Sequence, residues 1–284
     1  MRTPRLAASW YLYEQLARRR EYGDIVSPDG EIALSPELQI EADFFIAQLQ
    51  RRSAVVDIGC GLGFPALVLA PHVGCLVALD AAPTMVSQLR SHAQRLRLDN
   101  IRIMRADAEA LPFAGCRFDG AAICGTLGSL TNPQRMLDDL HRALQRGAIV
   151  ACVAENFADK LRLDRGKELR WFRMDEGQLS LRVVEYLRNP YRIRDYRYLF
   201  GKDSELCRQL LAEHEGSLSW REPTEQEAAD LPLGTVVKAI YDEAVQYDPA
   251  TLQAAFERAA FGLRSIELRR HLPVEHIFAA FERR

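Results

Sequence analysis

The chain has 284 residues, of which 48% are hydrophobic and 27% are charged, and its formal net charge is -2. These proportions are typical of a folded globular protein and exclude a largely disordered chain. A charge so close to zero gives no electrostatic reason to bind phosphate backbones, so we expect no nucleic-acid partner. Since no apolar run is long enough to span a membrane and no signal-peptide core begins the chain, we expect a cytoplasmic protein without a membrane span.

The first 50 residues are expected to form a helical cap. Residues 6–22 have a helical period and carry the aromatic residues Trp10, Tyr11 and Tyr13. These side chains either pack the helix against the rest of the protein or close over a bound ligand.

The next segment joins a buried strand to three closely spaced glycines. The apolar run that ends at Asp57 predicts a central parallel strand. Gly59, Gly61 and Gly63 follow, and glycine allows the backbone to turn sharply and to approach a ligand at the start of the next helix. Phe64 stands where a dinucleotide fingerprint requires its third glycine, which argues against NAD or FAD.

Strands and helices then alternate up to residue 155. Apolar runs that end in a turn or an acid alternate with amphipathic segments, an order typical of a doubly wound parallel sheet. Such a sheet binds its ligands at the carboxyl ends of its strands. The expected strands are residues 75–80, 101–106, 118–124 and 147–154, and the expected helices are 83–98 and 133–144.

The pattern changes in residues 156–222, which we expect to cap the substrate and to include the last elements of the core. The many arginines and tyrosines here indicate an exposed or a ligand-facing side. The expected elements are antiparallel strands at 169–174, 178–187 and 191–200, a helix over 204–215 and a strand at 217–221.

Residues 223–284 are expected to form a helical extension. Apolar residues recur at helical spacing from Leu252 to Ile266 and again from Val274 to Phe281. These stripes serve plain packing, a dimer surface or an active-site lid, so a monomer and a homodimer both stay open.

The six cysteines are scattered along the chain. They form no Cys-x-x-Cys pair and no His/Cys cluster at zinc spacing. We therefore expect reduced thiols and no metal site.

The glycine-rich segment resembles a known motif. Asp57-x-Gly59-x-Gly61-x-Gly63 is similar to motif I of the class I methyltransferases that depend on S-adenosylmethionine (SAM). Asp80 ends the second expected strand, where a doubly wound sheet holds the ribose hydroxyls of a nucleoside. The spacing thus predicts a nucleoside site that is built from two acids and a glycine turn.

A second stretch supports the same family. Residues 107–113, Asp-Ala-Glu-Ala-Leu-Pro-Phe, resemble a segment of the methyltransferases related to ubiquinone and menaquinone biosynthesis. In that family the acid accepts a hydrogen bond from the adenine amino group and the following backbone N–H donates to the ring. The resemblance gives these roles to Asp107 and Ala108, and it covers residues 55–155.

This resemblance implies an α/β fold: a Rossmann-like seven-stranded class I methyltransferase sheet with an added antiparallel hairpin region and a helical C-terminal tail. Residues 51–155 would form the SAM-binding core. The implied cofactor is SAM, and its product is S-adenosylhomocysteine. The residues expected to bind the cofactor are Asp57, Gly59, Cys60, Gly61, Gly63, Asp80, Ala81, Asp107, Ala108 and Cys124.

The implied activity is methyl transfer to a small-molecule acceptor. Residues 124–127 read Cys-Gly-Thr-Leu, where adenine and glutamine methyltransferases have Asn-Pro-Pro-Tyr, which argues against DNA or glutamine methylation. The same motifs also occur in SAM-fold enzymes that transfer no methyl group, such as cyclases, decarboxylases or hydroxylases. A non-catalytic SAM-binding protein is a further alternative.

Candidates for catalysis and acceptor binding lie beyond these motifs. Glu155 follows the fifth expected strand, where a general base would lie, although an acid there also caps a following helix. Arg192, Arg194, Arg197 and Tyr198 either form a solvated strand face or bind the acceptor. In the second case they favour an acceptor with a carboxylate, a phosphate or an aromatic ring.

Overall fold

The structure, a computed structural model, describes residues 13–14, 17–18, 25–115, 117–163, 169–175, 178–188, 191–201 and 238–284. The chain divides into two compact units. The core unit comprises residues 9–163 and 245–284, and the strand unit comprises residues 1–8 and 164–244. Each unit is described by itself.

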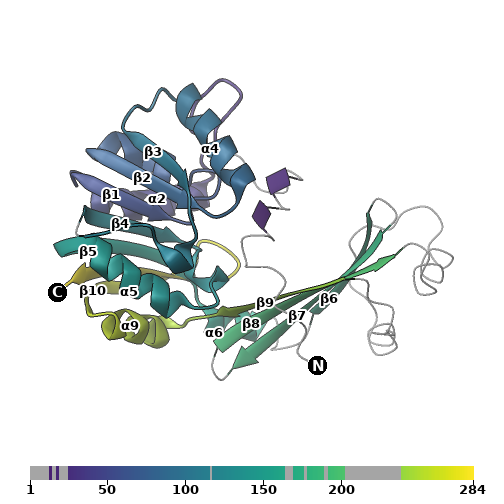
Figure 1. Cartoon of the computed structure of the whole chain (residues 1–284). Helices are drawn as coiled ribbons and strands as arrows, with labels where there is room; N and C mark the ends of the chain where they lie inside the picture. Colours follow the sequence, from purple (N-terminus) through teal and green to yellow (C-terminus); the bar gives the residue numbers. More distant parts are fainter. Residues whose placement is uncertain are drawn as a thin grey trace. The chain divides into compact units, whose positions relative to one another are not determined.

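The core unit contains a seven-stranded sheet in the order β10-β11-β5-β4-β1-β2-β3 (Figure 1). Strands β1 to β5 run parallel to one another, whereas β11 is antiparallel to both β5 and β10. The predicted Rossmann-like seven-stranded sheet is therefore confirmed. Its strands are β1 (Ala54–Ile58), β2 (Cys75–Asp80), β3 (Ile101–Arg105), β4 (Phe118–Cys124), β5 (Leu144–Glu155), β10 (Phe261–Arg269) and β11 (His276–Arg283).

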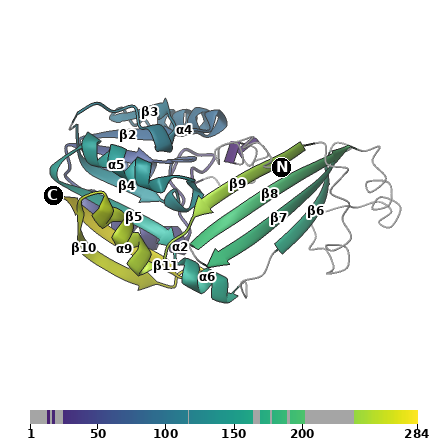
Figure 2. The same ribbon diagram turned by 60° about the horizontal axis from the view of Figure 1, so that its bottom comes forward.

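Helices cover both faces of this sheet. Along β5, Val150 and Cys152 pack with residues of α5 and α9, and Ala151 and Val153 pack with residues of α2, α3 and α4. Figures 1 and 2 show α5 and α9 on the same side of the sheet. The helices of this unit are α2 (Pro36–Leu49), α3 (Ala66–Leu69), α4 (Pro83–Arg95), α5 (Pro133–Ala143), α6 (Phe157–Leu163) and α9 (Pro249–Arg258), with short 3-10 turns at Ala70–His72, Ala108–Ala110 and Leu127–Ser129.

A second sheet has the order β6-β7-β8-β9. β7 is antiparallel to both β6 and β8, which confirms the expected antiparallel hairpin region. The strands are β6 (Leu169–Asp175), β7 (Gln178–Arg188), β8 (Tyr191–Gly201) and β9 (Lys238–Val245).

The expected helical C-terminal extension is wrong for most of its described length. Helix α9 ends at Arg258, and the two segments that follow are strands β10 and β11. They are the last strands of the core sheet, which we expected within residues 156–222. Ile277–Phe281 is buried throughout because β11 is an interior strand and its side chains pack in the cores on both faces of the sheet. An apolar run that is buried on both faces has no alternation, so its sequence does not separate a strand from a helix.

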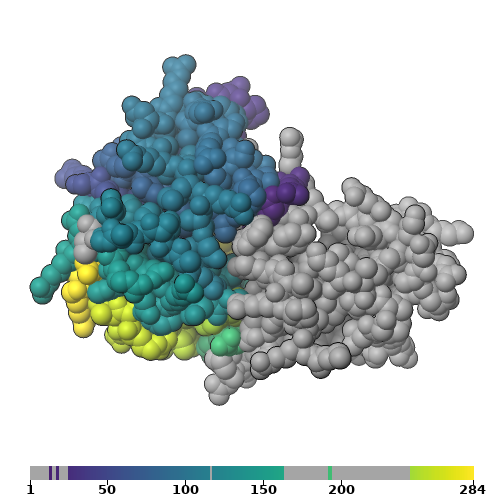
Figure 3. All heavy atoms as spheres, viewed as in Figure 1, coloured from purple at the N-terminus to yellow at the C-terminus, as the bar shows by residue number. Residues whose placement is uncertain are grey.

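Figure 3 shows the C-terminal residues, in yellow, beside residues from the middle of the chain, in teal. This proximity reflects the pairing of β11 with β5. Other expected elements lie outside the described residues: the helix over 204–215, the strand at 217–221 and most of the helix over 6–22. Of that last helix, the structure describes Tyr13, Glu14, Ala17 and Arg18, all as helical.

Candidate functional site

The turn after β1 has the backbone geometry that its glycines predict. Gly59, Gly61 and Gly63 have φ angles of +73°, +50° and +124°, which side chains rarely tolerate. A Cβ at Gly59 would collide with Thr126, whereas a Cβ at Gly61 would meet nothing within 4 Å. A Cβ at Gly63 would collide with Leu67 and Leu89, so the turn is closely packed at both ends and leaves room for a ligand at Gly61.

Asp57 is a fully buried carboxylate directly before this turn, with a relative exposure of 0%. Within the described part of the chain, neither of its carboxylate oxygens accepts a hydrogen bond of standard geometry, although the Ala66 N–H lies nearby. Burial raises the pKa of Asp57 well above its usual range, the backbone N–H of Ala66 opposes the rise, and the charge of Asp80 adds to it. An ionised Asp57 needs a compensating charge, so this position suits a cationic ligand.

Asp80 at the end of β2 ties the glycine turn to helix α4. Its Oδ2 accepts a hydrogen bond from the Gly61 N–H at 3.0 Å, and its Oδ1 accepts one from the Ala82 N–H at 2.8 Å. Burial raises the pKa of Asp80 despite these bonds, and the nearby charge of Glu14 contributes to the rise. Asp80 thus faces the turn, as its predicted role requires.

Asp107 follows β3, the neighbour of β2, so Asp57, Asp80 and Asp107 mark the carboxyl ends of three adjacent strands. The Asp107 side chain is exposed, and its Oδ1 accepts a hydrogen bond from the Glu109 N–H at 2.9 Å. It therefore caps the 3-10 turn in which Ala108 lies buried. The structure brings the three predicted acids to one edge of the sheet.

The remaining predicted cofactor residues lie along the same edge. Cys60 is buried within the glycine turn, and burial raises the pKa of its thiol well above the usual range. Ala81 follows Asp80, and its carbonyl accepts a hydrogen bond from Arg105 Nε at 3.1 Å. Cys124 ends β4. Burial also raises the pKa of the Cys124 thiol well above its usual range. Both thiols therefore stay protonated at neutral pH, and neither is a nucleophile here.

The comparisons with known proteins concern this segment. Residues 55–147 match a family model that is described as a methyltransferase domain. This stretch is a methyltransferase domain. It includes β1 to β4, the glycine turn and the three acids at the sheet edge.

Relatives of the methyltransferase domain are recognisable over short stretches. A 2-methyl-6-phytyl-1,4-hydroquinone methyltransferase from Oryza sativa subsp. japonica is 35% identical over 101 residues, which are 35% of this chain and 29% of that protein. The chain thus spans under a third of the length of that relative.

Solved structures resemble the whole fold. A SAM-dependent methyltransferase from Clostridium acetobutylicum has a TM-score of 0.59 at 12% identity, and the match covers 96% of each chain. The [4+2]-cyclase SpnF has a TM-score of 0.57 at 11% identity, over 98% of this chain and 97% of that one. At such identities the likeness concerns the fold alone.

N-terminal residues contact the methyltransferase domain on both sides of its glycine turn. Glu14, which is buried, accepts hydrogen bonds from the Thr84 N–H at 2.8 Å and the Thr84 hydroxyl at 2.7 Å. The Tyr13 hydroxyl bonds to Ser129, which follows β4, and Ala17 packs beside Leu62 of the turn. No local pattern predicts the role of Glu14, because its partner lies 70 residues away.

The candidate base Glu155 lies at the end of β5. Its side chain is 41% exposed and forms an ion pair with Lys160 at 2.6 Å. Its catalytic role stays a prediction. The same holds for the predicted acceptor residues on β8: the side chains of Arg194, Arg197 and Tyr198 lie outside the described residues, and Arg192 is half-buried.

A polar cluster that the sequence did not reveal lies beside the methyltransferase domain. Glu41 of α2 accepts a hydrogen bond from Cys124 Sγ at 3.4 Å on Oε2, and its Oε1 lies 2.8 Å from His271 Nε2. The side chains of His271 and Glu41 are 4% and 6% exposed. The two residues are 230 positions apart, so no local pattern predicts their contact.

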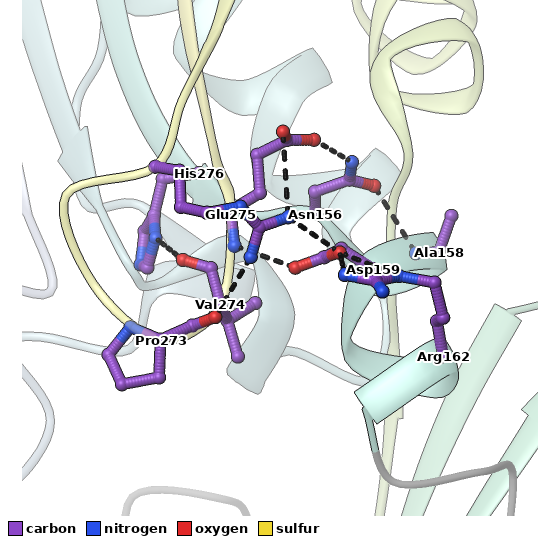
Figure 4. Close-up of polar contacts among 9 residues, drawn as sticks. Asn156, Ala158, Asp159, Arg162, Pro273, Val274, Glu275 and His276 are labelled. Atoms are coloured by element: carbon purple, nitrogen blue, oxygen red, sulfur yellow. Dashed lines mark hydrogen bonds and ion pairs between the residues drawn. The ribbon is translucent and has the colours of Figure 1, made fainter.

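His271 lies in the loop between β10 and β11, and a network of polar contacts holds this loop (Figure 4). Asp159 of α6 accepts hydrogen bonds from Arg270 and Arg162, each at 2.7 Å, and from the Glu275 N–H at 3.0 Å. Asn156 donates to Glu275 Oε2 at 2.8 Å. These donors, Arg270 above all, hold the pKa of Asp159 well below its usual range. The network fixes the backbone next to His271.

Two further observations bear on the kind of site. In the described ranges, no group of three or more His, Cys, Asp or Glu side chains is arranged to hold a metal ion. No helix in the same ranges has the length and apolar character that a membrane crossing requires.

Proposed function

We propose that the chain binds SAM and transfers its methyl group to a small-molecule acceptor. The observation that carries this proposal is the edge formed by β1, β2 and β3, where an open glycine turn lies between the unpaired carboxylate of Asp57 and the carboxylate of Asp80. The methyltransferase domain supports it, and the rice relative, which is named for a hydroquinone, supports a small molecule as acceptor.

The residues of this edge fit SAM in charge and in shape. Asp57 would lie near the positively charged part of the cofactor, and Gly61 would leave room for its backbone approach. Asp80 would accept hydrogen bonds from the ribose, and Asp107 and Ala108 would contact the adenine. When bound, SAM supplies an activated methyl group on a positively charged sulfur. The chain then has to align the acceptor and exclude water, since positioning alone lowers the barrier substantially.

Two further parts of the proposal have their own support. We propose a cytoplasmic location, because Cys60, Cys75, Cys124 and Cys152 are all free and thiols persist in reducing compartments. The alternative is an enzyme of the same fold that binds SAM without transferring its methyl group; the cyclase SpnF shares this fold.

Binding is tested by calorimetry with SAM and S-adenosylhomocysteine on the wild type and on Gly61→Val. The variant side chain fills the open space of the turn, so we expect loss of binding. Gly115→Val is the matched control, because Gly115 also has a positive φ, +75°, and open space at its Cβ. It precedes β4 at the opposite end of that strand from Cys124, so its variant should bind both ligands as the wild type does.

Transfer is tested by incubation of methyl-labelled SAM with fractions of small molecules from a lysate. The expected result is a labelled product, one methyl group heavier than its precursor, together with release of S-adenosylhomocysteine. Binding of SAM without any labelled product would favour the cyclase-like alternative. Unchanged SAM affinity in Gly61→Val would contradict the proposed site.

A further inference from the structure

The cluster of Cys124, Glu41 and His271 begins at the glycine turn. β4 pairs with β1 so that Ile123 is opposite Ile58, which places Cys124 level with Gly59. The Thr126 hydroxyl donates to the Ile58 carbonyl at 2.8 Å and closes this junction. Burial raises the pKa of the Cys124 thiol, and the charge of Asp57 contributes to the rise, so the thiol lies near the buried carboxylate beside the turn.

The cluster extends away from the predicted nucleoside residues. Asp80 and Asp107 follow β2 and β3 on one side of β1, whereas Cys124 follows β4 on the other side. His271 precedes β11, which pairs with β5, the next strand in that direction. We call the carboxyl ends of β4 and β5 with the loop of residues 270–275 the acceptor side. A ligand whose nucleoside lies over β2 and β3 would direct its reactive end toward it.

Both carboxylate oxygens of Glu41 are held by neighbouring side chains. Oε2 accepts a hydrogen bond from the Cys124 thiol, and Oε1 lies 2.8 Å from His271 Nε2. Within the described chain, His271 Nδ1 is buried and has no hydrogen-bond partner. Among the described residues, no lysine or arginine forms an ion pair with Glu41, so its carboxylate is held in place by Cys124 and His271 alone.

The loop that carries His271 is fixed. Arg270 binds Asp159. Glu275 binds both Asp159 and Asn156, as Figure 4 shows. Glu41 lies on α2, Cys124 at the end of β4 and His271 in the loop between β10 and β11, so three separate parts of the core unit hold the cluster. A charge held this rigidly needs no reorganisation when a positive charge develops near it.

We propose that Glu41, positioned by Cys124 and His271, is a fixed negative charge on the acceptor side that selects an uncharged amine as the acceptor. This inference rests on the proposed function. In methyl transfer the bond from carbon to sulfur breaks with its electron pair left on sulfur, and the acceptor lone pair forms the new bond. The positive charge therefore passes to the acceptor nitrogen, which Glu41 stabilises, and the nitrogen later releases its proton to water. An anionic acceptor would instead be repelled.

The test compares two ligands that differ in charge at the reactive position. Sinefungin carries an amine-bearing carbon in place of the methylated sulfur, so its ammonium group lies where the methyl group would be, and S-adenosylhomocysteine has no charge there. Calorimetry gives both affinities for the wild type and for Glu41→Gln. We expect the variant to bind sinefungin about tenfold more weakly and S-adenosylhomocysteine within about twofold of the wild type.

Two variants accompany this measurement. Asp43→Asn makes the same change of charge on the exposed face of α2, and it should change neither affinity. His271→Gln keeps Glu41 but removes a donor, and we expect an intermediate loss of sinefungin affinity, about threefold. The affinity for S-adenosylhomocysteine also shows whether each variant is folded.

The outcomes separate the inference from the proposed function. If the wild type binds both ligands and Glu41→Gln weakens both equally or neither, the inference is wrong and the proposed function stands. If the wild type binds neither, the proposed function fails and the inference fails with it. In the labelled-SAM screen, a product methylated on nitrogen supports the amine, and a methyl ester overturns it.

Discussion

The two halves of the sheet edge differ in how they are built. At β1, β2 and β3 the site consists of a glycine turn and three acids that lie within residues 57–107, each at the end of a strand. On the acceptor side, the cluster joins α2, β4 and a loop near residue 271. The residues of the first half can be predicted from the sequence because each of them lies at the end of its own strand. The second exists only after distant segments have packed.

The largest effect is expected from removal of the packing that supports the acceptor side. Phe281 of β11 is fully buried and stacks on Phe256 of α9 at 3.8 Å. Phe281→Ala should lower the free energy of unfolding by about 3–5 kcal/mol, the usual cost of deleting a buried phenylalanine. Denaturant unfolding measures the loss. Leu268→Ala on the neighbouring strand is the control, because Leu268 is 46% exposed and its loss should cost little.

Asp80, the residue predicted to bind the ribose, tests the half of the sheet edge that can be predicted from the sequence. Asp80→Ala removes the acceptor of the Gly61 and Ala82 N–H groups, together with the proposed contact to the ribose. We expect SAM affinity to fall by about 1.5–3 kcal/mol, the range for a hydrogen bond to a charged group. Calorimetry measures the change. An affinity within about twofold of the wild type would show that Asp80 stabilises the turn but does not bind the ribose.

Asp57 lies on β1, between the two halves of the edge. Its buried carboxyl group should lower the stability of the ligand-free protein and strengthen the binding of SAM. Its pKa is raised in the folded state, so between the unfolded and folded pKa values the folded protein binds more protons and loses stability as the pH rises. Asp57→Asn removes this loss, and ligand-free protein at pH 8 should gain about 1–2 kcal/mol, with a smaller gain at pH 5. Thermal unfolding at both pH values checks the sign. The same variant should bind SAM more weakly than the wild type.

The smallest effect is expected at Glu14. Helix α4 begins after Ala82, which provides no side-chain cap, and Glu14 accepts the Thr84 N–H in its place. Glu14→Ala should cost about 1 kcal/mol, as the loss of a helix cap usually does. It should also lower the pKa of Asp80, because the Glu14 charge helps to raise it. No change in stability would show that Thr84 finds another acceptor.

Sequence reasoning was reliable where structure is decided locally. The ends of β2 and β4 were predicted at Asp80 and Cys124, and the glycines of the turn have the positive φ angles expected of them. It was wrong for β10 and β11, because a run such as Ile277–Phe281 has no period that separates strand from helix. It missed Glu41 and His271 because a buried contact between residues 230 positions apart produces no local sequence pattern around either residue.

The position of β11 has a consequence for folding. β10 reaches the sheet only through β11, which pairs with β5 along the edge of β5 that faces away from β4. One edge of β5, residues 144–155, therefore stays unpaired until residues 276–283 have been synthesised, more than a hundred positions later. Contacts of such long sequence separation slow folding and leave a strand edge exposed in the meantime. During synthesis this edge would be the part of the nascent chain most in need of protection from other strands.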